Sequence, residues 1–192
     1  MKNRMNKKLN IIWFLVTFVI VLDTPGFAKI GYSNAENGLN IRIKGNEDAE
    51  VINKLSYGTE IKIIKEGVGR NREWTKIMID DLIGYIHSDY IQEENPFDEM
   101  EYLGNWHITA YAATGSPCAN GNMPTVGYTV ACNSLDFGTE IYIKDVGFRM
   151  VEDRGPGWLG SEWCDIYLGN TQDCVNWGTQ YKDVYLVKEN EK

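Results

Sequence analysis

The sequence has little of what proteins use to bind metal ions. It contains only two histidines, His87 and His107, and its four cysteines form no C-x-x-C pair. Structural zinc sites are usually built from such pairs together with histidine. We therefore expect no metal site and no cofactor.

Long apolar runs are absent after the first residues. Ile11 to Leu22 is uncharged, follows a basic start, and precedes the small-residue pattern of Gly26 to Ala28. This arrangement is typical of a secretory signal peptide over residues 1–28, because the run is short for a membrane span. We expect cleavage, no stable membrane insertion afterwards, and a location outside the cytoplasmic membrane. The alternative is an uncleaved N-terminal anchor.

An excess of basic residues is also lacking. The formal net charge is −8 at pH 7, and the chain after residue 28 is more acidic still, because the leader is net basic. Nucleic acids and anionic lipids attract proteins through Lys and Arg. We therefore expect no nucleic acid among the partners.

The cysteines are confined to the later part of the chain. They are Cys118, Cys132, Cys164 and Cys174. In an exported protein an even number of cysteines predicts disulfide bonds. We expect two bridges, although four cysteines allow three pairings and the sequence does not choose among them.

No helical periodicity appears between residues 29 and 92. Short stretches predict strands there instead, at residues 39–43, 51–55, 60–65, 74–79 and 83–87. Such close spacing of short strands predicts a small β-barrel.

The motifs of this first segment resemble those of bacterial SH3-like domains. They are Gly38-Leu39-Asn40-Ile41-Arg42, Gly58-Thr59, Trp74, Gly84-Tyr85 and Ser88-Asp89-Tyr90-Ile91. The resemblance implies an SH3-like domain over residues 29–92 that binds cell-wall peptide or acts as a spacer. Trp74, Tyr85 and Tyr90 either line a recognition groove or belong to the core, and we expect Trp74 in the core.

A second β-rich segment follows an acidic stretch. Residues 93–101 contain a proline and predict an exposed linker. Further strands are expected at residues 106–112, 127–131, 138–143, 148–151, 165–168 and 183–187. Residues 171–177 predict a short helix with Asn170 as its N-cap. The fold class predicted for the chain is all-β.

A glycine- and tryptophan-rich loop separates two aspartates, Asp153 and Asp165. Both border predicted strands, where aspartate is unfavourable, and Trp158 and Trp163 supply flat apolar surfaces nearby. Carboxylates beside aromatic faces are typical of sugar-cleaving sites, because burial raises the pKa of one acid until it can donate a proton. The alternative is a turn in which both aspartates cap backbone amides.

Landmarks of the second segment resemble, in order, those of the three-aspartate or 3D domain. They are Thr109-Ala110-Tyr111, Leu135-Asp136-Phe137-Gly138-Thr139, Asp153-Arg154-Gly155, Asp165-Ile166-Tyr167 and Trp177-Gly178. The resemblance implies a six-stranded double-psi β-barrel over residues 102–188. Barrels of this kind occur in lytic transglycosylases, which cleave the glycan strands of peptidoglycan.

The same resemblance implies the roles of individual residues. Asp165 matches the catalytic acid/base, and Asp153 matches a second family aspartate. The place of the first family aspartate falls on Asn133, while Asp136 lies three residues later. The expected substrate-binding residues are Thr109, Tyr111, Asn133, Trp163 and Tyr167. The aromatic residues two positions before and after Asp165 are expected to raise its pKa by desolvation.

The implied protein is a monomeric lytic transglycosylase, secreted or associated with the cell wall. It would cleave between N-acetylmuramic acid (MurNAc) and N-acetylglucosamine (GlcNAc) with a single aspartate as acid and base. Its partners would be the glycan strands and stem peptides of peptidoglycan. Two alternatives remain open: a non-catalytic wall-binding protein of expansin-like type, and a glycoside hydrolase in which Asp136 or Asp153 is the second carboxylate.

Overall fold

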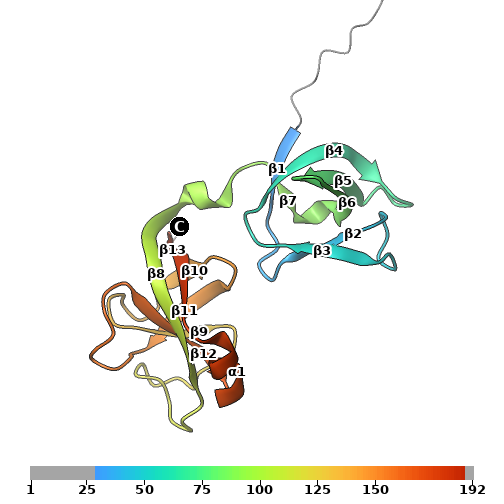
Figure 1. Cartoon of the computed structure of the whole chain (residues 1–192). Coiled ribbons are helices and arrows are strands. Elements are labelled where there is room, and N and C mark those ends of the chain that lie inside the picture. Colours follow the sequence, from blue (N-terminus) through green and yellow to red (C-terminus); the bar gives the residue numbers. More distant parts are fainter. Residues whose placement is uncertain (1–28, 189–192) are drawn as a thin grey trace, which may run out of the picture.

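The computed structural model describes residues 29–188, and Figure 1 shows them as two β-rich bodies joined by a short connection. The expected signal peptide, residues 1–28, lies outside the described residues. Within residues 29–188, no helix is long and apolar enough to cross a membrane.

The first body is a seven-stranded sheet. In sheet order its strands are β3 (Val51–Leu55), β2 (Leu39–Arg42), β6 (Leu82–His87), β5 (Trp74–Ile79), β4 (Glu60–Val68), β1 (Lys29–Ser33) and β7 (Ile91–Gln92), with the 3-10 helix η1 (Ser88–Tyr90) before β7. Alternation along the strands directs every second side chain inward, so Ile77 and Ile86 are fully buried. Trp74 is 6% exposed, which confirms its expected place in the core.

The connection between the bodies is only partly exposed. It contains the 3-10 helix η2 (Pro96–Glu99), in which Pro96 is buried. Phe97 packs against Tyr57 of the first body and Tyr185 of the second, with ring centroids 6.1 and 4.8 Å away. The segment expected to be a plain linker therefore contributes a side chain to the contact between the bodies.

The second body is a closed six-stranded barrel. In order around the barrel its strands are β10 (Glu140–Ile143), β11 (Gly147–Asp153), β9 (Thr129–Cys132), β12 (Trp163–Gly169), β8 (Met100–Ala112) and β13 (Gln180–Val187). β12 pairs with β8 and β11 with β9 in parallel, whereas the other neighbours are antiparallel. Apolar side chains fill the interior, among them Ile108, Val130, Ile141, Ile166 and Val184.

Among residues 29–188, one short α-helix packs on the barrel. The helix α1 (Thr171–Trp177) has the predicted bounds, and Asn170 Oδ1 caps it by accepting the N–H of Asp173 at 2.9 Å. The indole N–H of Trp177 donates to the carbonyl oxygen of Ile108 at 3.1 Å. The helix is thereby fixed to β8.

An aromatic cluster also joins the two bodies directly. Tyr57 of the first body lies 5.3 Å from Tyr142 and 5.1 Å from Phe148 of the barrel, measured between ring centroids. Beside these rings, Ser56 Oγ donates to Asp145 Oδ1 at 3.0 Å. Aromatic pairs of this kind each contribute about 0.5–1.5 kcal/mol beyond the burial of their area, so the contact favours one relative orientation of the bodies.

All four cysteines are free, so the expectation of two disulfide bonds is wrong for this structure. Cys132 and Cys164 lie opposite each other on β9 and β12 and are completely buried in the barrel core. Buried thiols pack as small apolar side chains, and Cys132 and Cys164 pack in this way in the barrel core. Cys118 lies in the loop after β8, and Cys174 lies on α1.

Candidate functional site

The predicted site residues lie on the outer face of the barrel. Alternation directs Ile108 of β8 into the core, so its neighbour Thr109 points outward. The strand register places Thr109 opposite Asp165 of β12, Asp165 opposite Ala131 of β9, and Ala131 opposite Asp153 of β11. We call this line of four residues the carboxylate row. The small side chain of Ala131 leaves space between the two aspartates, whose strands are roughly 10 Å apart because neighbouring strands lie about 4.8 Å apart.

Asp165 has the environment of a proton donor. Its carboxyl group is half-buried, and burial raises its pKa above the ordinary value; the charge of Asp153 raises the pKa further, whereas a hydrogen bond with Thr109 lowers it. Its Oδ1 atom is buried and has no hydrogen-bond partner among residues 29–188. A buried oxygen without a partner favours protonation or a ligand that donates to it.

Asp153 is held differently. Its Oδ1 atom accepts the backbone N–H of Ala119 at 2.9 Å and that of Arg154 at 2.8 Å. The turn-capping alternative considered for both aspartates therefore describes Asp153, and no such contact to Asp165 occurs in the described part of the chain. The two carboxyl groups thus differ in environment, since backbone N–H groups of the described residues bind Asp153 and leave Asp165 without such a contact.

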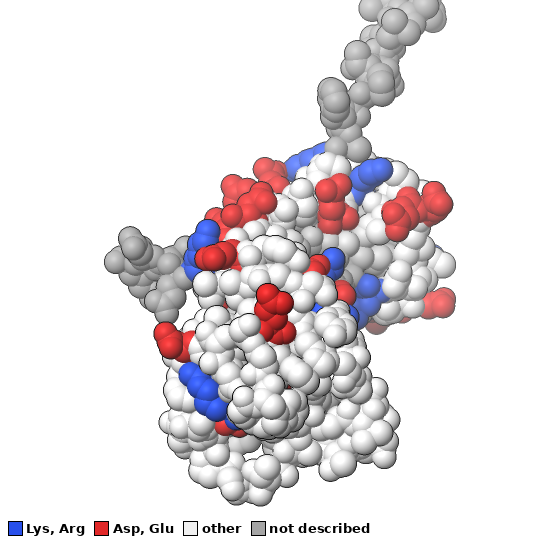
Figure 2. Space-filling model, turned by 60° about the vertical axis from the view of Figure 1, so that its left-hand side comes forward, with Lys and Arg blue, Asp and Glu red and all other residues white. Residues whose placement is uncertain are grey.

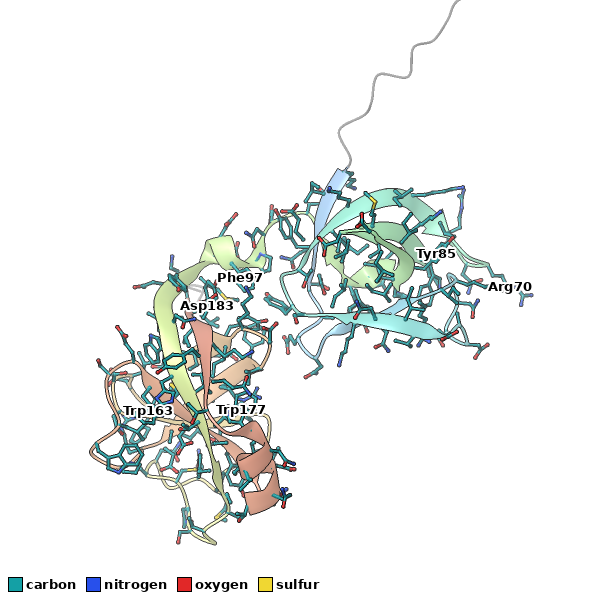
Figure 3. The ribbon with its side chains drawn as sticks, in the orientation of Figure 1. Arg70, Tyr85, Phe97, Trp163, Trp177 and Asp183 are labelled. Atoms are coloured by element: carbon teal, nitrogen blue, oxygen red, sulfur yellow. The ribbon has the colours of Figure 1, made fainter. Side chains whose placement is uncertain are left out.

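A stack of rings flanks the carboxylate row on one side. Trp163 donates its indole N–H to Thr109 Oγ1 at 2.9 Å. His107 lies against Trp163, and Tyr181 stacks on His107, with ring centroids 4.0 and 5.0 Å apart. Figure 3 shows Trp163 on a different side of the barrel from Trp177 of α1. The predicted desolvating residue Trp163 is thus next to the row and braced by two further rings.

The other side of the row carries Tyr111 and Tyr167, whose ring centroids are 5.2 Å apart. Tyr167 is buried, and the hydroxyl group of Tyr111 is buried without a hydrogen-bond partner in the described structure. Burial raises the pKa of Tyr111, and the charge of Asp153 adds to the effect. Tyr111 therefore stays a neutral phenol that can donate to a ligand.

Asn133 is committed to the backbone. Its Oδ1 accepts the N–H of Gly155 at 3.0 Å, and its Nδ2 donates to the carbonyl oxygen of Pro156 at 3.1 Å. The adjacent Ser134 donates to the carbonyl oxygen of Ser161 at 2.6 Å. These bonds hold both ends of the loop between β11 and β12. An ionised aspartate has no donor for Pro156, so the amide of Asn133 suits this anchoring position, where the sequence predicted contact with substrate.

A third carboxylate, Glu152, was not predicted from the sequence and is 7% exposed. Thr129 Oγ1 donates to it at 2.6 Å and Asn122 Nδ2 at 2.9 Å. Burial favours a higher pKa, but these hydrogen bonds outweigh it and the pKa of Glu152 is lowered. Glu152 is a buried anion that anchors the loop carrying Ala119, the residue that donates to Asp153.

The first body has a groove of its own, with a volume of about 700 Å³. Trp74, His87 and Tyr90 line it, and the ring centroids of Trp74 and Tyr90 lie 5.5 and 5.9 Å from that of His87. Its acidic lining residues are Glu36, Glu47, Asp48 and Asp89. In Figure 2 acidic side chains gather on the upper body, whereas the barrel surface in view carries few charges.

Comparison with known families assigns this part of the chain. Residues 37–92 match the family model of the bacterial SH3 domain. The match spans β2 to β7 and nearly all of the residues that line the groove. The groove is therefore a feature of the SH3 domain.

The barrel lies outside the part that matches. No curated protein is significantly similar to the chain, so the interpretation of the barrel depends on its geometry. Asp136, considered above as a second acid, is exposed in the turn before β10 and does not belong to the carboxylate row. Within residues 29–188 no group of three or more His, Cys, Asp or Glu side chains is arranged to hold a metal ion.

Proposed function

We propose that this protein is an exported cell-wall enzyme whose barrel, of the double-psi type, acts as a lytic transglycosylase on peptidoglycan. The observation that carries the proposal is Asp165, a half-buried acid whose pKa is raised by burial and whose Oδ1 atom has no partner among the described residues. The SH3 domain supports a wall partner, since bacterial SH3 domains typically bind peptidoglycan.

One carboxyl group is sufficient for the chemistry. Protonated Asp165 donates its proton to the glycosidic oxygen between MurNAc and GlcNAc as the bond from that oxygen to C1 breaks. The resulting carboxylate removes the proton of the C6 hydroxyl of the MurNAc residue, and the C6 oxygen bonds to C1 to close an anhydro ring. Water is not consumed, and Asp165 ends the cycle protonated.

The neighbours of Asp165 have supporting roles in this proposal. Asp153, fixed by two backbone N–H groups, places negative charge where positive charge develops at C1. Tyr111 has a buried hydroxyl that is free to donate to a sugar oxygen. Thr109 is positioned by the indole of Trp163 at 2.9 Å and orients the carboxyl group of Asp165.

The test is the variant Asp165→Asn with purified peptidoglycan. Loss of the proton donor should reduce the release of anhydro-muropeptides at least about 100-fold, without lowering the melting temperature at neutral pH. The matched control is Asp136→Asn, which changes an exposed aspartate of the same body and should leave release unchanged. Undiminished release by Asp165→Asn would refute the assignment. Products with reducing ends would indicate the hydrolase alternative.

A non-catalytic wall binder is the second candidate. It is favoured by Asn133, which stands at the place of the first family aspartate and has both polar groups bonded to backbone. In that case the wild-type protein would bind glycan strands and leave them intact. Mass spectrometry of peptidoglycan after incubation separates the candidates, because only cleavage creates new ends.

A further inference from the structure

The loop between β11 and β12 has a fixed shape although it contains no helix or strand. Asn133 and Ser134 bind its two ends, as described above. Leu159 anchors its middle: this side chain is 6% exposed, and it packs so closely on Gly155 that a Cβ atom there would overlap it. The N–H of Leu159 also donates to the carbonyl oxygen of Pro156 at 2.9 Å.

This rigid loop presents Trp158 to solvent. The side chain of Trp158 is 70% exposed. Its ring meets Trp163 edge to face, with centroids 5.2 Å apart and an interplanar angle of 72°. A contact of this kind fixes an aromatic ring while most of its surface stays uncovered. An indole that is already held in place can pack against a ligand without first losing side-chain freedom.

The surroundings of Trp158 indicate the chemistry of that ligand. The central residues of the loop, Gly155 to Ser161, carry no charge, and its charged residues Arg154 and Glu162 stand at its two ends. The segment around Trp158 therefore favours an uncharged ligand. Trp163, which contacts Trp158, donates to Thr109 of the carboxylate row. The ring of Trp163 therefore links Trp158 to Thr109, the neighbour of Asp165 in the carboxylate row. A sugar fits both features, because its C–H face packs on an aromatic ring while its hydroxyl groups bond to carboxylates.

We propose that Trp158 forms a sugar-stacking subsite, which binds one ring of the glycan strand next to the bond held at Asp165. The subsite rests on the proposed function, because it takes the same polymer, but it is a binding site and needs no catalysis. The subsite also explains the position of Asn133. By anchoring the loop, Asn133 fixes the position and orientation of the Trp158 ring. Asn133 is thus a positioning residue that acts through Trp158.

Binding is measured by calorimetry with a GlcNAc–MurNAc tetrasaccharide, in the Asp165→Asn background so that the ligand stays intact. Adding Trp158→Ala should weaken binding roughly tenfold, as expected for loss of an aromatic anchor, whereas Trp158→Phe should retain most of the affinity. The matched control is Tyr128→Ala, which removes a 44% exposed aromatic ring of the barrel outside this loop and should leave affinity unchanged. Equal affinity of the Trp158→Ala variant and its parent would overturn the subsite.

A second variant tests the anchor without touching the indole. Asn133→Asp removes the donor to Pro156 and should weaken tetrasaccharide binding about threefold, while the melting temperature changes little. Unchanged affinity would remove Asn133 from the proposal.

The outcomes separate the subsite from the proposed function. If the wild-type protein binds the tetrasaccharide through Trp158 and never cleaves peptidoglycan, the subsite stands and the enzyme fails. If the wild-type protein releases anhydro-muropeptides and Trp158→Ala binds as its parent does, the enzyme stands and the subsite fails. If the tetrasaccharide does not bind to the parent, the subsite is overturned whatever the enzyme does.

Discussion

The two bodies place their carboxylates in opposite environments. In the first body acidic residues line a groove, and the side chains of the ion pair formed by Lys29 and Glu66 are 49% and 58% exposed. In the barrel Glu152 is buried and Asp165 half-buried, with pKa shifts in opposite directions. An exposed carboxylate can attract positive charge, whereas burial favours the protonated form of a carboxyl group unless hydrogen bonds stabilise the anion, as they do at Glu152. Under the proposed function, this contrast places recognition in the SH3 domain and proton transfer in the barrel.

The largest effect should come from breaking one core at a time. Ile77 of the SH3 domain and Ile108 of the barrel are both fully buried, so truncation to Ala should cost each body about 2–5 kcal/mol of unfolding free energy. In a Phe97→Ala background, which should uncouple the bodies, Ile108→Ala should lose glycan cleavage near the melting temperature and keep sedimentation with peptidoglycan, and Ile77→Ala should do the reverse. Loss of both activities in both variants would show that the division of labour is wrong.

A smaller effect should follow from separating the bodies. Phe97 packs against Tyr57 and Tyr185, so Phe97→Ala should lower the unfolding free energy by roughly 2 kcal/mol and resolve the calorimetric transition into two. The matched control is Tyr102→Ala, since Tyr102 is 56% exposed and contacts Tyr185 within the barrel alone. A single sharp transition in Phe97→Ala would mean that other contacts hold the bodies together.

How much of the molecule could be predicted from the sequence depends on whether a feature is determined by one segment or by several distant ones. Local signals were sufficient where one segment determines the outcome, as in the helix that starts after Asn170 and the core position of Trp74. Strand β1 (Lys29–Ser33) escaped prediction because its pairing with β4 and β7 is decided by distant segments. Mostly β structure was predictable because alternation is also a local signal.

Features of the site that depend on strand register could not be predicted from local sequence patterns. Asp165 could be singled out because its motif is contiguous, but its pairing with Thr109 and Ala131 is set by three strands distant in sequence. The anchoring role of Asn133 depends on a loop some twenty residues later. The cysteine count predicted bridges because it ignores burial, whereas the barrel core uses Cys132 as a small apolar side chain.

The smallest and most discriminating effect is the pH dependence of stability. The pKa of Asp165 is raised in the fold, so its contribution to stability is fully present below the unfolded pKa of about 3.9 and is lost as pH rises through the folded pKa. The variant Asp165→Asn should therefore gain melting temperature over the wild type as pH rises, with no gain near pH 3.

Glu152 provides the opposite slope within the same barrel. Its pKa is lowered, so its contribution is present above the unfolded pKa and is lost as pH falls through the folded pKa. The deficit of Glu152→Gln relative to the wild type should shrink on acidification. Melting curves of the variants from about pH 3 to pH 8 measure both slopes. If Asp165→Asn followed the slope of Glu152→Gln, Asp165 would be a structural anion like Glu152, and the barrel would have no proton donor to distinguish it from the SH3 domain.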